Sequence, residues 1–132
     1  MISLNSPTLA VPNRHAPRVP LCAAAGERIF RLSMIALIWR YEVREEARSA
    51  FEATYGPTGA WAQLFARSDG FRGTELLKAA DGSYLTLDVW RSREDFDAFM
   101  AEHNADYEAL DRSIESWTSA EHRLGDYEVL GD

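Results

Sequence analysis

The stretch Gly73–Met100, GTELLKAADGSYLTLDVWRSREDFDAFM, decides the fold. Two runs rich in alternating apolar and polar residues, 71–79 and 83–90, flank a short Ala-Asp-Gly segment that is typical of a β-hairpin turn. Ser92 follows the second run, and Asp95 stands three residues later, a spacing that resembles a helix capping box. The stretch therefore predicts strand, turn, strand and helix in direct succession.

The second predicted strand has two different faces. Its aliphatic face (Leu85, Leu87, Val89) is expected to pack against helices, because removing apolar side chains from water is favourable. Its mixed face fits an interior that is neither a pure core nor bulk water, and comprises Tyr84, Thr86, Asp88 and Trp90.

Upstream, residues 34–43 predict a strand whose two faces are both mostly apolar, with Ile35, Leu37, Trp39 and Tyr41 on one of them. Residues 44–66 follow with helical spacing, interrupted by Gly56-Pro57-Thr58-Gly59. We expect Gly56 to end the first piece in a left-handed conformation, and Tyr55 and Trp61 to flank the break at the rim of a small-molecule pocket.

Downstream, the helix after Ser92 continues through Tyr107, Leu110, Ile114 and Trp117, with a bend near Asn104. Residues 121–130 predict a last strand with a weak point at Gly125. The order β-α-β-β-α-β predicts a ferredoxin-like α+β domain, an antiparallel four-stranded sheet with helices on one face. A second copy of the chain would cover the open sheet face, so we expect a homodimer that forms an α/β barrel.

Residues 1–33 differ from the rest of the chain. They contain four of the five prolines, and four arginines against one glutamate, so we expect an irregular N-terminal extension ahead of a domain at 34–132. The favoured interpretation is that translation naturally starts at Met34, and a transit peptide is the alternative.

The composition of the chain limits the classes of partner that we expect. The formal net charge of −7 argues against nucleic acid, and no apolar run reaches the roughly 20 residues that span a bilayer. The single cysteine, Cys22, excludes an internal disulfide and a cysteine-based metal cluster, which fits a cytoplasmic protein. The sequence has no paired-histidine metal spacing, no glycine-rich phosphate loop and no dinucleotide fingerprint, so we expect neither metal nor cofactor.

Taken together, MIALIWRYEV (34–43), the hairpin and helix quoted above, and the closing Leu-Gly strand resemble the antibiotic-biosynthesis-monooxygenase (ABM) family of dimeric α/β-barrel proteins. The resemblance covers residues 34–130. It implies the fold above and a superfamily that includes cofactor-free oxygenases, haem-degrading enzymes, quinol oxygenases and isomerases. Haem-degrading relatives carry an Asn on the first strand and a Trp on the helix after the hairpin. Here Trp39 and Arg40 stand in the first region and Phe99 near the second, so haem degradation is the less favoured function.

The predicted site gathers aromatic residues that combine a flat apolar surface with a polar atom, together with Arg40 as a possible anchor for an anionic oxygen. Its predicted ligand-binding members are Trp39, Arg40, Tyr55, Trp61, Trp90 and Tyr107. His103 is the predicted catalytic base toward a phenol, because an imidazole titrates near neutral pH. For each, a structural role is the alternative: the aromatics as core, His103 as a histidine at a helix bend, and Arg40 as the partner of Asp88 in a buried ion pair.

Two functions follow. The first is a cofactor-independent monooxygenase-like enzyme acting on a small aromatic or quinol-type compound. The second is a non-catalytic dimeric protein that binds a small aromatic ligand in the same fold.

Overall fold

The computed structural model describes residues 33–131, and the predicted N-terminal extension lies outside that range. The elements, in chain order, are β1 (Ile35–Val43), η2 (Glu45–Ala47), α2 (Arg48–Tyr55), α3 (Ala60–Phe65), β2 (Phe71–Lys78), β3 (Tyr84–Trp90), α4 (Arg93–Ser113), η3 (Glu115–Trp117) and β4 (Thr118–Glu128). The predicted β-α-β-β-α-β order is confirmed, with the first helical region in two pieces.

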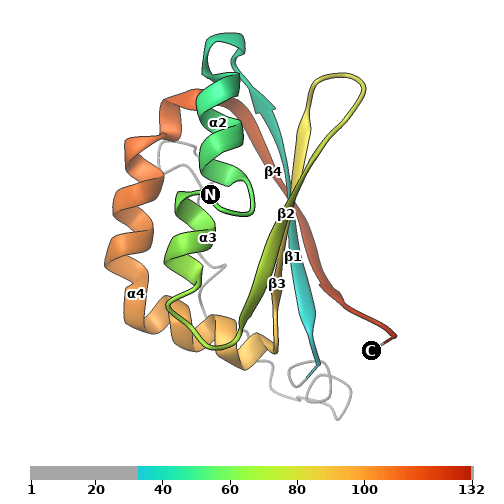
Figure 1. Ribbon diagram of the computed structural model, residues 1–132, viewed down its shortest axis with the longest axis vertical. Coiled ribbons are helices and arrows are strands. Elements are labelled where there is room, and N and C mark those ends of the chain that lie inside the picture. Colours follow the sequence, from blue (N-terminus) through green and yellow to red (C-terminus); the bar gives the residue numbers. More distant parts are fainter. Residues whose placement is uncertain (1–32, 132) are drawn as a thin grey trace.

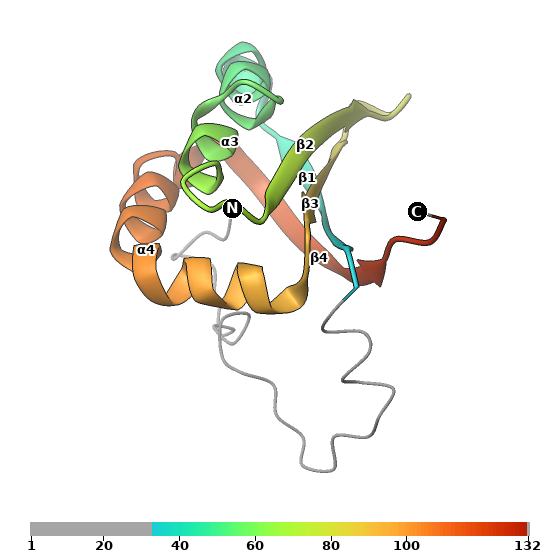
Figure 2. The ribbon, with the colours of Figure 1, turned by 60° about the horizontal axis from the view of Figure 1, so that its bottom comes forward.

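The four strands form one antiparallel sheet in the order β2-β3-β1-β4. The three α-helices within residues 33–131 pack on the same side of it, as Figures 1 and 2 show. This is the ferredoxin-like α+β fold predicted from the sequence. The chain therefore builds two layers, with the core between the sheet and the helices.

The helix-covered face of the sheet is not the one predicted for β3. On β1 the buried row is Ile35, Leu37, Trp39, Tyr41 and Val43, as the alternation indicates. Leu37 pairs with Asp88 and Trp39 with Thr86, so the mixed row of β3 lies beneath the helices. The aliphatic row of β3 faces away from them, half-buried. The prediction was wrong because the register with β1, which the pattern of β3 alone does not contain, decides which row is covered.

The break between α2 and α3 also differs from the prediction. Gly56 has φ −77° and ψ 178°, and Gly59 has φ −84° and ψ −173°, so both are extended rather than left-handed. Glycine is required at position 59 because there is no room for a side chain. A Cβ there would lie 2.3 Å from the carbonyl oxygens of Ala53 and Thr54, so the start of α3 packs directly against the backbone of α2.

Helix α4 begins as predicted. Ser92 is its N-cap, and its hydroxyl oxygen accepts a hydrogen bond from the backbone N–H of Asp95 at 3.1 Å. The predicted bend is present at His103, where φ −119° and ψ 22° leave the helical range, and Figure 2 shows the change of direction. Beyond Ser113 the predicted helix gives way to η3.

Strand β4 contains the predicted irregularity at Gly125. The register against β1 shifts between Ile38 and Trp39, and Gly125 takes φ +142°, which favours glycine. Asp126, on the helix side of the next pair, binds Arg93 of α4 and Arg123 of its own strand. Arg93 is buried, so this group of charges ties the start of α4 to the outer strand.

The opposite face of the sheet is apolar at its centre, and no helix of residues 33–131 covers it (Figure 1). Ile38, Leu85, Leu87 and Val89 lie half-buried at its centre. Two larger side chains on the same face are more exposed: Leu77 at 45% and Tyr127 at 51%. The second apolar row of β1 thus lies on a sheet face that only another layer of protein could bury.

Candidate functional site

A line of polar side chains crosses the otherwise apolar layer between the sheet and the helices. We call it the polar seam, and it comprises Tyr41, Tyr55, Trp61, Thr74, Thr86, Asp88, Tyr107 and Asp111. Each of these residues is buried. Polar groups in such a layer cost free energy unless they are paired, so a group of this size is the feature of the core that packing alone does not explain.

The floor of the seam is built by the sheet. Thr74 on β2 is paired in register with Asp88 on β3, and its hydroxyl donates to the Asp88 carboxylate at 2.7 Å. One step along the same face, the Thr86 and Tyr41 hydroxyls are 3.4 Å apart. Three neighbouring strands thus present hydroxyl and carboxyl oxygens to the helices at the centre of the sheet.

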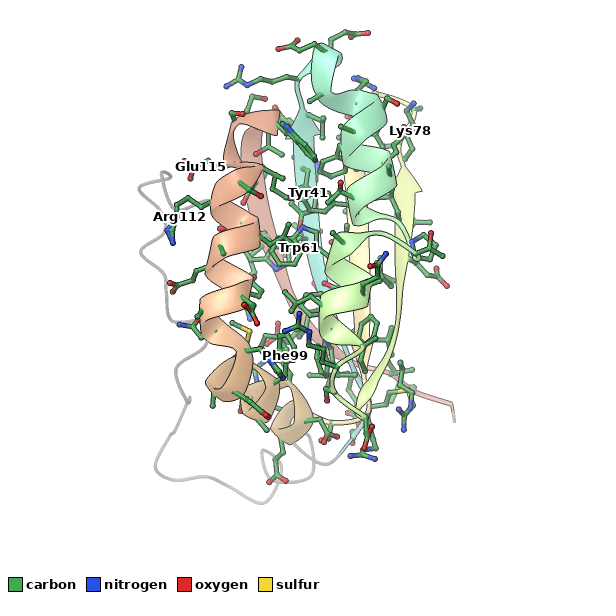
Figure 3. All side chains as sticks on the ribbon, turned by 60° about the vertical axis from the view of Figure 1, so that its left-hand side comes forward. Tyr41, Trp61, Lys78, Phe99, Arg112 and Glu115 are labelled. Atoms are coloured by element: carbon green, nitrogen blue, oxygen red, sulfur yellow. The ribbon has the colours of Figure 1, made fainter. Side chains whose placement is uncertain are left out.

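The helices supply aromatic rings above this floor. Ring centroids are 5.2 Å apart for Tyr41 and Tyr55, 6.1 Å for Tyr55 and Trp61, and 5.0 Å for Trp61 and Tyr107. In Figure 3, Tyr41 and Trp61 lie between α4 on one side and the α2–α3 pair on the other. The seam therefore draws on all three helices, and Trp61 sits where they meet.

The indole N–H of Trp61 is a buried donor without a well-formed hydrogen bond. It lies close enough to the Tyr55 hydroxyl to lower that group's pKa, but the contact does not meet the distance and angle of a well-formed hydrogen bond. Leaving a fully buried donor of this kind without a hydrogen bond costs free energy of folding.

The hydroxyl groups of Tyr41 and Tyr55 in the polar seam resist ionisation. Burial raises the pKa of Tyr41 well above its ordinary value of 10.0, and Tyr55, Glu121 and Asp88 raise it further. Burial likewise raises the pKa of Tyr55, with Glu121 and Asp111 acting in the same direction. Both tyrosines therefore stay neutral hydrogen-bonding groups across the physiological pH range.

These shifts predict a loss of stability in alkaline solution. Above pH 10 the unfolded chain releases tyrosine protons that the folded chain retains, so the free energy of unfolding falls as pH rises. The slope is about 1 kcal/mol per pH unit for each of the two tyrosines. Urea denaturation at pH 8–11 should show it, and Tyr41→Phe or Tyr55→Phe should flatten it. The exposed Tyr127→Phe is the control, and an equal slope in all four proteins would contradict the assignment.

The predicted site residues fall into three groups. Tyr55, Trp61 and Tyr107 belong to the seam, and Trp39 stacks on Tyr41 at 6.3 Å beside it. Trp90 is fully buried at the far end of β3, where its ring packs among Phe65, Phe71, Phe96 and Phe99. Phe65 connects the two regions, with centroids 5.8 Å from Trp61 and 5.5 Å from Trp90.

His103 and Arg40 lie apart from the seam's centre. His103 stands at the bend of α4, with its ring 5.0 Å from Phe99 and its side chain 20% exposed. Arg40 is on the open face of the sheet and pairs with Glu42 at 3.3 Å. The predicted ion pair between Arg40 and Asp88 is wrong, because the two side chains leave the sheet on opposite faces.

Sequence reasoning missed several seam residues: Tyr41, Thr74, Thr86 and Asp111. Asp111 was hidden among the charged residues of α4, although its place four residues after Tyr107 puts it on the same helix face. Within residues 33–131, no three His, Cys, Asp or Glu side chains are placed to share a metal ion. No helix in that range has the length and apolarity needed to cross a membrane.

The family described as Antibiotic biosynthesis monooxygenase matches residues 34–109, more than half of the 132-residue chain. The chain belongs to this family. The match begins at β1 and ends within α4, so it contains most of the polar seam. No curated protein matches the chain in sequence.

Several solved structures have a similar fold. Rv0793 from Mycobacterium tuberculosis is 26% identical with a TM-score of 0.55, covering 76% of this chain and 98% of its own. SnoaB, a cofactor-independent oxygenase from Streptomyces nogalater, is 22% identical with a TM-score of 0.51, covering 76% and 96%. A putative antibiotic biosynthesis monooxygenase from Caulobacter crescentus CB15 is 15% identical with a TM-score of 0.62, covering 82% and 100%. These structures share the overall fold of this chain.

Proposed function

We propose that this ABM-family protein is a cofactor-independent monooxygenase acting on a small aromatic or quinol-type compound in the polar seam. The observation that supports it is the set of buried hydroxyl, carboxyl and indole groups lined by flat rings, in a chain of this family. Flat rings bind an aromatic ligand, and fixed polar atoms orient its oxygens.

In the proposed reaction, a base removes a proton from a phenol or enol hydroxyl. The electron-rich anion then reacts with dioxygen: one oxygen atom stays on the ring, and the other leaves as water with two hydrogens from the substrate. The substrate supplies both electrons, so the balance needs no other reductant. His103 is the proposed base: its half-buried imidazole stands four residues before Tyr107 on α4, so the reacting hydroxyl would lie at the His103 end of the seam rather than at its centre.

Access requires movement. Tyr55 and Trp61 are 1% and 0% exposed, so a ligand reaches the seam only when their rings shift. Helix α3 has only six residues, between the Gly56–Gly59 break and the turn at Gly70, so it is the element that we propose moves to admit the ligand.

The test measures binding and turnover separately. Quenching of tryptophan fluorescence by 1,4-dihydroxynaphthalene under argon reports binding, and an oxygen electrode reports catalysis above the uncatalysed rate. We expect both in the wild type, and binding without accelerated oxygen uptake in His103→Gln. Binding without turnover in the wild type would favour the non-catalytic binding protein, and no binding would overturn the proposed site.

We propose further that two copies of the chain pack through their open sheet faces as a homodimer. Light scattering should give the mass of two 14.9 kDa chains. Leu87→Glu should shift the mass to one chain, because it places a charge at the centre of the apolar face. Ala109→Glu, the same new side chain on the exposed side of α4, should leave the dimer intact. A wild-type monomer at micromolar concentration would contradict the proposal.

A further inference from the structure

The segment that contains helix α3 is tied to its neighbours at both ends by close-packed glycines. At the first end Gly59 touches the backbone of α2, where a Cβ would lie 2.3 Å from two carbonyl oxygens. At the second end Gly70 is buried, and a Cβ there would lie 2.4 Å from the Cβ of Asp95 on α4. The Gly70 carbonyl oxygen also accepts a hydrogen bond from the Arg91 N–H at 2.7 Å. A displacement of α3 would therefore be a rotation of the residues between these two ends.

The inner side of this segment covers the polar seam. Trp61 and Phe65 are fully buried, and their ring centroids lie 5.0 Å and 6.4 Å from that of Tyr107 on α4. The outer side is exposed, as at Arg67. Figures 1 and 3 show α3 and α4 side by side. Moving the segment away from α4 would thus separate these rings and uncover the seam.

An ion pair joins the outer side of the segment to α4. The Arg67 guanidinium binds the Asp106 carboxylate at 2.7 Å. Asp106 directly precedes Tyr107, so the pair ties the segment to α4 next to the contact between Tyr107 and Trp61. The two side chains are 51% and 58% exposed, so salt screens the pair and its effect on stability is small. An exposed contact of this kind can break and re-form while the core stays folded.

We infer that residues 59–70 form a lid over the polar seam, which rotates between Gly59 and Gly70, and that the Arg67–Asp106 ion pair is its latch. This inference rests on the proposed function, because it assumes that a ligand binds in the seam. The ligand enters between α3 and α4, and the ion pair controls the rate of entry without contacting the ligand.

A latch has a kinetic signature that a binding residue lacks. The ion pair is present in the closed protein with and without ligand, and it is broken while the lid is open. Its removal therefore lowers the barriers to association and to dissociation equally. Both rate constants rise, and the dissociation constant stays the same. A residue that contacts the ligand would change the dissociation constant instead.

The experiment measures both rate constants for the full chain by stopped-flow quenching of tryptophan fluorescence with 1,4-dihydroxynaphthalene under argon at pH 7. In Asp106→Asn we expect each rate constant to rise about two- to fivefold, the range for loss of an exposed ion pair. Raising NaCl to about 0.5 M should have a similar effect on the wild type and little effect on the variant, because this ligand is uncharged and the salt acts on the latch.

Glu45→Gln is the matched control. It removes the carboxylate of another exposed ion pair, with Arg48 at 3.9 Å, in an element that precedes α2 and is not part of the lid. Its rate constants should equal those of the wild type. Exchanging the two partners of the latch, with Arg67→Asp and Asp106→Arg in one chain, should return both rate constants toward the wild-type values.

Unchanged rate constants in Asp106→Asn would overturn the latch and leave the proposed function standing. A changed dissociation constant would also overturn it, because Asp106 would then act on the bound ligand. If the wild type does not bind the ligand, the proposed function fails. The lid is then tested without ligand by hydrogen exchange of the α3 backbone amides, which should be about two- to fivefold faster in Asp106→Asn than in the wild type. Equal exchange would overturn the lid as well.

Discussion

Trp61→Ala should lower the free energy of unfolding by about 3–5 kcal/mol, the usual cost of removing a fully buried tryptophan. The ring is 0% exposed and packs against Tyr55, Phe65 and Tyr107, so its removal leaves a void that three elements line. In a domain of this size such a loss corresponds to a fall on the order of 15–25 °C in Tm. Thermal and urea denaturation measure it directly.

Two further variants provide a comparison for this loss of stability. Trp61→Phe retains most of the ring volume and should cost much less, whereas Trp117→Ala removes a half-buried indole at the edge of the core and should fall between them. If the void persists, indole added to Trp61→Ala should raise its Tm by refilling the space, because ligands that bind only the folded state stabilise it. A loss below about 1 kcal/mol, the size of an ordinary surface substitution, would show that Trp61 is not part of the core, despite its burial.

The sequence predicted the architecture well, for identifiable reasons. Alternation along β1, the Asp-Gly turn and the Ser92 cap are local signals, and each is read from residues close together in the chain. Their order leaves few ways to pair four strands, so the ferredoxin-like topology followed. The bend of α4 and the bulge at Gly125 were predicted for the same reason, from residues that disturb a regular pattern locally.

The errors concern long-range pairing. Whether Asp88 faces the helices depends on its register with Leu37, which is distant in the chain, and nothing in the alternation of β3 specifies that register. The aliphatic row of β3 was assigned to the helices because apolar side chains are expected in a core. In the structure that row lies on the open face, where burial requires a further layer.

The candidate site was predicted only in part. Aromatic residues with helical spacing drew attention to Tyr55, Trp61 and Tyr107, which the fold does bring together. Thr74, Thr86 and Asp111 are common residue types, and they become informative only once three strands and a helix place them in one buried line. Whether this line binds a ligand stays a prediction.

Gly59→Ala is the second substitution for which we expect a large effect, about 3 kcal/mol of stability. Overpacking a tight site costs about 1–3 kcal/mol, and here the cost should reach the upper end because the clashing atoms are backbone carbonyls rather than side chains that can rotate. The new methyl would lie 2.3 Å from the oxygens of both Ala53 and Thr54. Relief requires α3 to move away from α2.

The controls separate space from conformation. Gly59 has an extended backbone that alanine also adopts, so any loss is steric. Gly56→Ala, whose methyl would meet a single carbonyl oxygen at 2.9 Å, should cost less, and Pro57→Ala in the exposed turn should cost least. The reverse order would show that the break is held by its turn residues and not by the close contact between helices.

A double-mutant cycle connects this contact to the seam. If the methyl at position 59 acts by displacing α3, it weakens the packing of Trp61, and the loss from Trp61→Ala should be smaller in the Gly59→Ala background than in the wild type. Urea denaturation of the four proteins gives the coupling energy. Additive losses would mean that Gly59 and Trp61 stabilise the domain independently, and that the glycine break does not position the indole over the sheet.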